Sequence, residues 1–190
     1  MSTTNIQQTL SDIDAAVEKI KNDAPQNFPE AASIGDTVRQ GDLYIQLIDE
    51  ADLASLTDLY AAVPTEALAD NLQLAPGNTK GSRHVIEHTD GLLMWQPVKT
   101  EEAAARHVCK QNGIPLSKRG GRPIDQVHTH WREFANTRAA LLLAGPVFKC
   151  TKPNTVVHPE HGNWNLPVGT YRVIFQRTVN DQEAIQRVLD

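Results

Sequence analysis

The chain has 190 residues, enough for one sizeable hydrophobic core with a small appendage but too few for two ordinary domains. Hydrophobic residues make up 40% and charged residues 22%, and no apolar run approaches the roughly 18 residues of a membrane span, so we expect a globular protein without a membrane partner. The polar N-terminus lacks a secretory signal, and Cys109 and Cys150 form no CxxC pair, so we expect a cytoplasmic protein with two buried thiols.

The formal net charge of −5 is distributed unevenly along the chain. Residues 99–138 contain eight Lys and Arg against four Asp and Glu, a net charge of +4, which leaves −9 for the remainder. Contact with phosphate needs local positive charge, and an evenly acidic chain would argue against nucleic acid as a partner. The basic segment keeps that class of function open.

The first residues of the chain carry an apolar stripe. Five apolar residues from Ile6 to Ile20 are spaced by four, three, four and three residues, which predicts an N-terminal helix. This helix is too short to form a stable coiled coil by itself, so it either packs on its own domain or forms the subunit contact of a homo-oligomer. Residues 22–35 are typical of a linker, and we assign 1–35 to this helix and linker.

Residues 36–98 and 140–190 are expected to form one β-rich domain. The segment from Val38 to Ile48 alternates in polarity as a strand does, whereas residues 50–72, interrupted at Pro64, have the spacing of one or two short helices. Turns are expected at several glycines and prolines, Gly145-Pro146 among them. Further strands are expected at 83–88, 92–95, 140–150, 155–158 and 170–177. This pattern predicts an α+β fold with a barrel or sandwich-like domain.

Residues 99–139 are expected to form an inserted unit of two helices. Thr100 can cap the first, which begins with acidic residues at the positive end of its dipole, and Gly113 suits a left-handed exit. Pro123 is placed to start the second, whose apolar stripe ends at Trp131 and can bury against the first helix.

The loop between these two helices suggests a DNA-binding function. Glycines between its arginines would let guanidinium groups enter a narrow groove, and A·T-rich minor grooves are both narrow and strongly negative. Such an insertion would select A·T-rich DNA by shape, with Lys and Arg outside the groove contacting phosphates. The predicted DNA-binding residues are Lys110, Ser117, Lys118, Arg119, Gly120, Gly121, Arg122 and Arg132.

The same segment, AARHVCKQNGIPLSKRGGRPIDQVHTHW, resembles the C-terminal DNA-binding unit of Lsr2-type nucleoid proteins of actinobacteria and their phages. The resemblance implies an Arg-Gly-Arg loop that inserts into A·T-rich minor grooves. The residues that match are Asn112, Gly113, Ser117, Arg119, Gly120, Arg122 and Trp131. Gly121 departs from the pattern by adding one residue between the arginines. A solvated basic loop, or an RNA or protein partner, remains an alternative.

Histidines in the β-rich domain form a candidate metal site. His158 and His161 are three residues apart at a turn after a strand, where two imidazoles can bind one ion, and His84 or His88 can supply a third ligand. We therefore consider His84, His158 and His161 as ligands of zinc or another divalent ion. With Glu160 as a base, such a site could hydrolyse a substrate, so enzymatic activity stays open. Histidines that hydrogen-bond within the loop or lie on the surface are the alternative.

Outside the basic segment, the chain resembles a small family of uncharacterised bacterial and phage proteins. The shared features are Arg39-Gln40-Gly41-Asp42, the segment Gly81 to Ile86, a His-x-x-His turn at residues 158–161 and a Leu-Pro-x-Gly-x-Tyr motif at 166–171. The resemblance implies no activity. The family has Gly-His-x-His where this chain has Gly81-Ser82-Arg83-His84, so one potential ligand is missing. A structural or partner-binding role in a phage or bacterium is therefore a third interpretation, beside DNA binding and metal binding.

Overall fold

The computed structural model describes residues 26–75, 83–116, 121–179 and 185–187. The N-terminal helix predicted between Ile6 and Ile20, with its subunit contact, lies outside the described residues, as do loop residues Ser117, Lys118, Arg119 and Gly120. No helix in the described ranges is long and apolar enough to cross a membrane.

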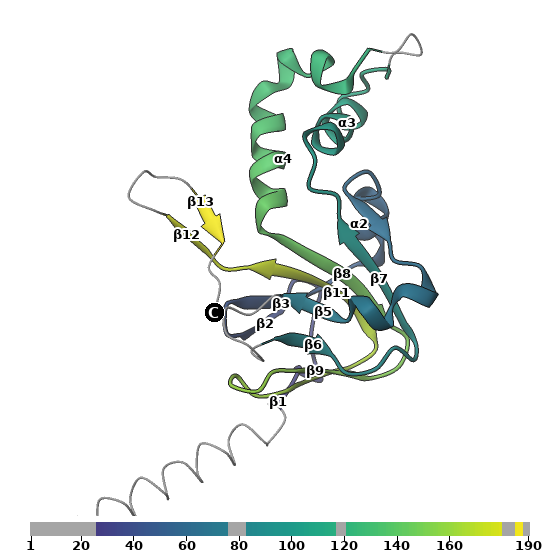
Figure 1. Ribbon diagram of the computed structural model, residues 1–190, viewed down its shortest axis with the longest axis vertical. Helices are drawn as coiled ribbons and strands as arrows, with labels where there is room; N and C mark the ends of the chain where they lie inside the picture. Colours follow the sequence, from purple (N-terminus) through teal and green to yellow (C-terminus); the bar gives the residue numbers. More distant parts are fainter. Residues whose placement is uncertain (1–25, 76–82, 117–120, 180–184, 188–190) are drawn as a thin grey trace, which may run out of the picture.

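Two sheets face each other across an apolar core (Figure 1). In the described residues the smaller sheet has the order β1-β10-β9-β6-β5 and the larger the order β2-β3-β11-β8-β7-β4. The strands of the smaller sheet are β1 (Gln26–Asn27), β5 (Gln73–Ala75), β6 (His84–Ile86), β9 (Asn154–Val157) and β10 (Trp164–Leu166). Those of the larger sheet are β2 (Thr37–Gln40), β3 (Leu43–Ile48), β4 (Tyr60–Ala62), β7 (Leu92–Pro97), β8 (Ala144–Cys150) and β11 (Gly169–Phe175). The expected β-rich α+β fold is confirmed, with two open sheets in a sandwich-like arrangement.

The helices lie between strands of the larger sheet in sequence. The α-helices are α2 (Glu50–Ser55), α3 (Glu101–Gln111) and α4 (Trp131–Leu143). Short 3₁₀ helices span Thr65–Ala67, Ala69–Asn71, Pro123–Gln126 and His128–His130. A separate hairpin of β12 (Arg177–Val179) and β13 (Ile185–Arg187) reaches α4.

The larger sheet is covered on both faces, because successive side chains of a strand point to opposite sides. In β8, Phe148 belongs to the core between the sheets, whereas its neighbour Val147 belongs to a second core beneath the helices; both are fully buried. Val108 of α3 and Phe134 of α4 complete this second core. The helices therefore pack on the outer face of the sheet.

The helical segment connects two strands that pair directly. β7 and β8 are antiparallel neighbours, with Leu92 opposite Cys150 and Trp95 opposite Val147. The residues between these strands contain α3 and α4, which rise from one end of the hairpin (Figure 1). The helices share a core with the larger sheet. The division of the chain into an inserted unit at 99–139 and a separate β-rich domain at 36–98 and 140–190 therefore stays a prediction.

The predicted second helix is wrong at both ends. Residues 123–130 form two 3₁₀ helices, and α4 begins at Trp131 and continues to Leu143, inside the segment predicted as a strand. A 3₁₀ helix has about three residues per turn, so residues spaced for an α-helix no longer share a face. Val127 is fully buried as expected, but Trp131 is 58% exposed instead of packing on α3.

The turn predicted at Gly145-Pro146 is also wrong, because both residues lie within β8. Gly145 is needed there for a close approach: a Cβ atom would lie 2.5 Å from Val173 Cγ1 and 3.0 Å from Phe175 Cζ. Glycine in a strand often marks such a contact between neighbouring elements.

We predict that Gly145→Ala lowers the free energy of unfolding by about 1–3 kcal/mol, since the added methyl group overpacks the contact with β11. Urea unfolding of the full chain measures this change. Leu142→Ala, three residues away on the exposed side of α4, is the matched control and should change stability by less than about 0.5 kcal/mol. Equal stability of the two variants would contradict the close-approach role of Gly145.

Candidate functional site

The end of the helical segment farthest from the sheets contains the start of α4 (Figure 1). Trp131 begins this helix and lies between two arginines in sequence. Arg122 immediately precedes the 3₁₀ helix at Pro123 and is exposed, and Arg132, also exposed, follows Trp131 at the start of α4. The Trp131 ring contacts the buried Phe134, with ring centroids 5.1 Å apart, which fixes its position while leaving it accessible. We call Gly121, Arg122, Trp131 and Arg132 the insert tip.

The local sequence explains how the tip is held. Thr100 Oγ1 accepts a hydrogen bond from the Ala103 amide and caps α3 as predicted, and Gly113, at φ +64°, supplies the left-handed exit. The Asn112 amide then donates to Glu133 Oε2 over 2.6 Å and connects the end of α3 to the start of α4. The hydrogen bonds from Asn112 and His130 lower the pKa of the Glu133 carboxyl.

Other basic side chains of this helical segment form ion pairs with carboxylates. Arg138 pairs with Glu101 at 2.9 Å and Arg106 with Glu102 at 3.9 Å. Lys110, predicted to contact phosphate, lies beside α2 and pairs with Asp58 at 3.0 Å. Within the described residues, the arginines of the tip form no ion pair. The uncompensated positive charge of the described helical segment is therefore concentrated at its far end.

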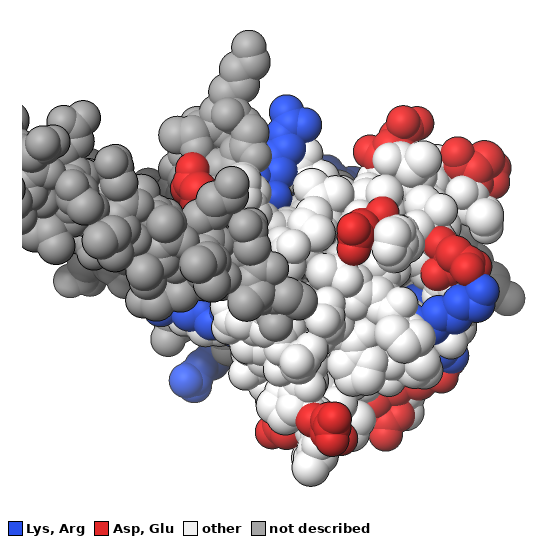
Figure 2. All heavy atoms as spheres, turned by 90° about the horizontal axis from the view of Figure 1, so that it is seen from below, with Lys and Arg blue, Asp and Glu red and all other residues white. Residues whose placement is uncertain are grey.

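The opposite end of the molecule has a different character. Figure 2 views it from below, so that the helical segment is on the far side, and shows mainly uncharged residues with scattered acidic side chains. The basic side chains in this view lie near its edges. This asymmetry agrees with the charge distribution in the sequence and would orient a polyanion toward the insert tip.

Three histidines converge between the two sheets. His84 begins β6, His158 follows β9, and His161 lies in the next turn. The ring centroids of His84 and His158 are 4.3 Å apart, those of His158 and His161 4.4 Å, and those of His84 and His161 6.1 Å. The structure thus brings together the three residues that the sequence selected as candidate ligands, whereas His88 pairs with Glu87 on the surface.

In the turn after β9, one ring nitrogen of His158 accepts hydrogen bonds from the backbone. The backbone N–H groups of Glu160 and His161 donate to His158 Nδ1 over 3.1 and 3.0 Å. A neutral imidazole has one lone pair for accepting, so its proton is then on Nε2 and neither nitrogen offers an electron pair to a metal ion. The His-x-x-His spacing is explained here by a turn in which the first histidine accepts from the residues that follow it.

Both nitrogens of His84 face acceptors. The Gln40 side-chain amide donates to the carbonyls of Val156 and Gly162, which leaves its Oε1 3.0 Å from His84 Nδ1. His84 Nε2 lies 3.2 Å from Asp42 Oδ1, and the side chains of Asp42 and His84 are each 2% exposed. An imidazole that donates from both nitrogens is an imidazolium, so this arrangement favours a buried His84–Asp42 ion pair.

These roles leave the metal site without geometric support. No group of three His, Cys, Asp or Glu in the described part of the chain is arranged to hold a metal ion. Zinc binding by His84, His158 and His161 therefore stays a prediction. The sequence analysis did not include Gln40 and Asp42 among the candidate site residues, although both polar residues flank Gly41 at a tight turn between two alternating strands.

Comparisons with known proteins add no relative: the chain matches no protein-family model, no curated protein and no solved structure. The two resemblances noted in the sequence remain predictions.

We predict that nitrogen-15 NMR of the imidazole groups shows both nitrogens of His84 protonated near neutral pH and an unprotonated Nδ1 in His158. A single protonated nitrogen in His84 would contradict the ion pair.

Asp42→Asn should lower the free energy of unfolding by roughly 3–5 kcal/mol, because it leaves a buried charge without its partner. Asp36→Asn, an exposed carboxylate in the turn before β2, is the control.

Proposed function

We propose that this protein binds DNA through the insert tip, with preference for A·T-rich minor grooves. The observation that carries the proposal is an exposed Trp131 at the start of α4, together with the exposed Arg122 and Arg132, which have no ion-pair partner among the described residues. Exposed arginine and aromatic side chains at one protruding end are the groups that contact phosphates, groove edges and deoxyribose.

The way the helical segment is held supports DNA contact at its protruding end. The tip belongs to a helical segment fixed at its base by the core beneath the helices and at its end by the Asn112–Glu133 hydrogen bond. The carboxylates within the segments that carry the tip are Asp125 and Glu133, of which Glu133 is hydrogen-bonded to Asn112, whereas acidic side chains are scattered over the opposite end of the molecule (Figure 2). A duplex can therefore approach the tip without meeting the acidic surface, and this arrangement increases the rate of association with a polyanion.

The preference for A·T-rich DNA rests on the sequence of the loop. Lys118 and Arg119 precede Gly120 and Gly121, and Arg122 completes an Arg-Gly-Gly-Arg run whose middle residues have no side chain to obstruct the groove. The resemblance to the Lsr2-type unit supports the same mode of binding. Arg122 and Arg119 would enter the minor groove, while Arg132 and, after release from Asp58, Lys110 would contact phosphates; surface ion pairs of this kind contribute only about 0–1 kcal/mol.

We expect fluorescence anisotropy to show tighter binding to an A·T-rich than to a G·C-rich duplex, with affinity that falls steeply as salt increases. The double variant Arg119→Ala and Arg122→Ala should weaken binding to the A·T-rich duplex by about tenfold or more, because each inserted arginine contributes roughly 1–3 kcal/mol of discrimination.

Arg138→Ala is the matched control, since it also removes an arginine from the helical segment but one that is paired with Glu101. It should leave affinity within about twofold of the unchanged chain, as a lost surface ion pair predicts. No binding of either duplex at low salt would refute the proposal. Equal losses of affinity in the control and the double variant would mean that the chain attracts DNA only by nonspecific charge. Tighter binding of single-stranded than of duplex DNA would show that Trp131 stacks on bases instead.

A further inference from the structure

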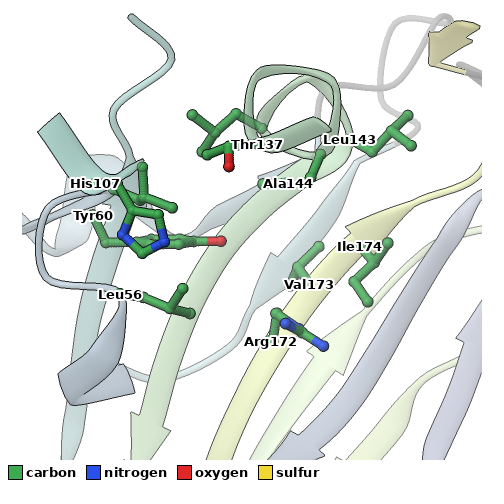
Figure 3. A pocket seen from close by; sticks show the side chains of 12 residues that line it. Leu56, Tyr60, His107, Thr137, Leu143, Ala144, Arg172, Val173 and Ile174 are labelled. Carbon is green, nitrogen blue, oxygen red and sulfur yellow. The ribbon is translucent and has the colours of Figure 1, made fainter. Parts of the chain in front are cut away.

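A cleft of about 380 Å³ lies where the helices meet the outer face of the larger sheet, within the range of roughly 300–1,000 Å³ typical of small-molecule sites. Figure 3 shows it between the end of α4, the segment that follows α2, and β11. Most of its wall is aliphatic. The aliphatic residues that line it include Leu56, Leu59, Leu141, Leu143 and Ile174.

Polar groups are few, and all of them are uncharged or basic. Tyr60, His107, Thr137 and Arg172 line the cleft, and none of its lining residues is an Asp or Glu. His107 is 5% exposed, and its Nδ1 makes no hydrogen bond to another described residue. A buried polar atom of this kind is unfavourable unless it finds a partner, so the ring is an available hydrogen-bonding group in an otherwise apolar wall.

Arg172 gives the cleft its charge. Its cross-strand neighbours in β11 pairing are Gln46 and Val147, both neutral, and its Nη2 donates to Gln46 Oε1 over 2.6 Å. The Nε atom is buried and makes no hydrogen bond within the described part of the chain, and no described carboxylate pairs with the guanidinium. The cleft therefore combines one arginine, which has no carboxylate partner among the described residues, with an aliphatic wall beside it.

The other ionisable groups do not change this charge at neutral pH. Burial lowers the pKa of His107, so its ring is neutral, and burial raises the pKa of Tyr60 although the nearby Arg172 opposes that rise. One positive charge in the cleft is complementary to one negative charge on a ligand. Dianions such as phosphate monoesters would leave a charge uncompensated in the apolar surroundings.

We propose that this cleft binds a small monocarboxylate with an apolar tail, whose carboxylate accepts hydrogen bonds from Arg172 and whose tail lies against the leucines that follow α2 and those at the end of α4. The site is separate from the insert tip and does not depend on DNA binding. A carboxylate satisfies an arginine donor with a charge-assisted hydrogen bond, and the tail removes aliphatic surface from water.

The test is titration calorimetry of the full chain with decanoate and, as a neutral probe of the same length, 1-decanol. We expect decanoate to bind at least about tenfold more tightly than decanol, as one charge-assisted hydrogen bond implies. Arg172→Gln should reduce decanoate affinity to that of decanol and leave decanol unchanged. Arg83→Gln, an exposed arginine beside the smaller sheet, is the matched control and should bind as the unchanged chain does.

Thr137→Trp provides a second variant that leaves Arg172 in place. Thr137 is a half-buried residue on α4 that lines the cleft, so a larger side chain there fills the cleft without entering the core, and both ligands should lose binding. Melting curves of each variant confirm that it is folded. Equal affinity for decanoate and decanol, no measurable binding of either, or decanoate binding that survives Thr137→Trp would each overturn the proposal.

Discussion

The direct pairing of β7 with β8 is the constraint on which the rest of the structure depends. Because these strands are neighbours, the long connection between them must leave and return at the same end of the sheet. α4 ends at Leu143 and β8 begins at Ala144, so helix and strand are continuous. The direction of the helix is therefore set by the strand, and the tip is carried on a rigid support and not on a flexible linker.

The alternation of side chains along the larger sheet places different groups on its two faces. Val147 and Arg172 point to the helical side, where one belongs to the core beneath the helices and the other to the cleft. Phe148 and Tyr171 point to the core between the sheets, and the His84–Asp42 pair lies on that side of the molecule, at the ends of β2 and β6. The cleft and the core beneath the helices share Leu59, Tyr60 and Leu141, so a change in one of these two environments also affects the other.

The sequence was most informative where a pattern is local. Alternation located β3 and β11, and the Thr100 cap and the Gly113 exit bounded α3, because each depends on residues within one turn or strand. The 3₁₀ turns after Pro123 were not predictable, since the same residues suit the first turn of an α-helix, and the outcome is decided by how Val127 fits against α3.

The candidate sites depend on contacts that are distant in sequence. The convergence of His84 with His158 was predictable from a strand and a turn, but the partners of the His84 nitrogens, Gln40 at the end of β2 and Asp42 in the turn before β3, are distant in sequence. Arg172 resembled an ordinary outward residue of a strand until the helices were placed above it. Gly121, Arg122 and Arg132 of the tip were predicted from the pattern of glycine and basic residues and from the family resemblance, whereas the exposure of Trp131 was not predicted.

The central claim is that DNA contacts the molecule at the end of the helical segment and nowhere on the sandwich. Amide hydrogen exchange of the full chain, with and without an A·T-rich duplex, tests this claim most directly because it locates protection along the sequence. The account predicts slower exchange within residues 121–133 and unchanged exchange in β6, β9 and β10. Protection confined to the smaller sheet, or none in residues 121–133 under conditions where the duplex is bound, would contradict it.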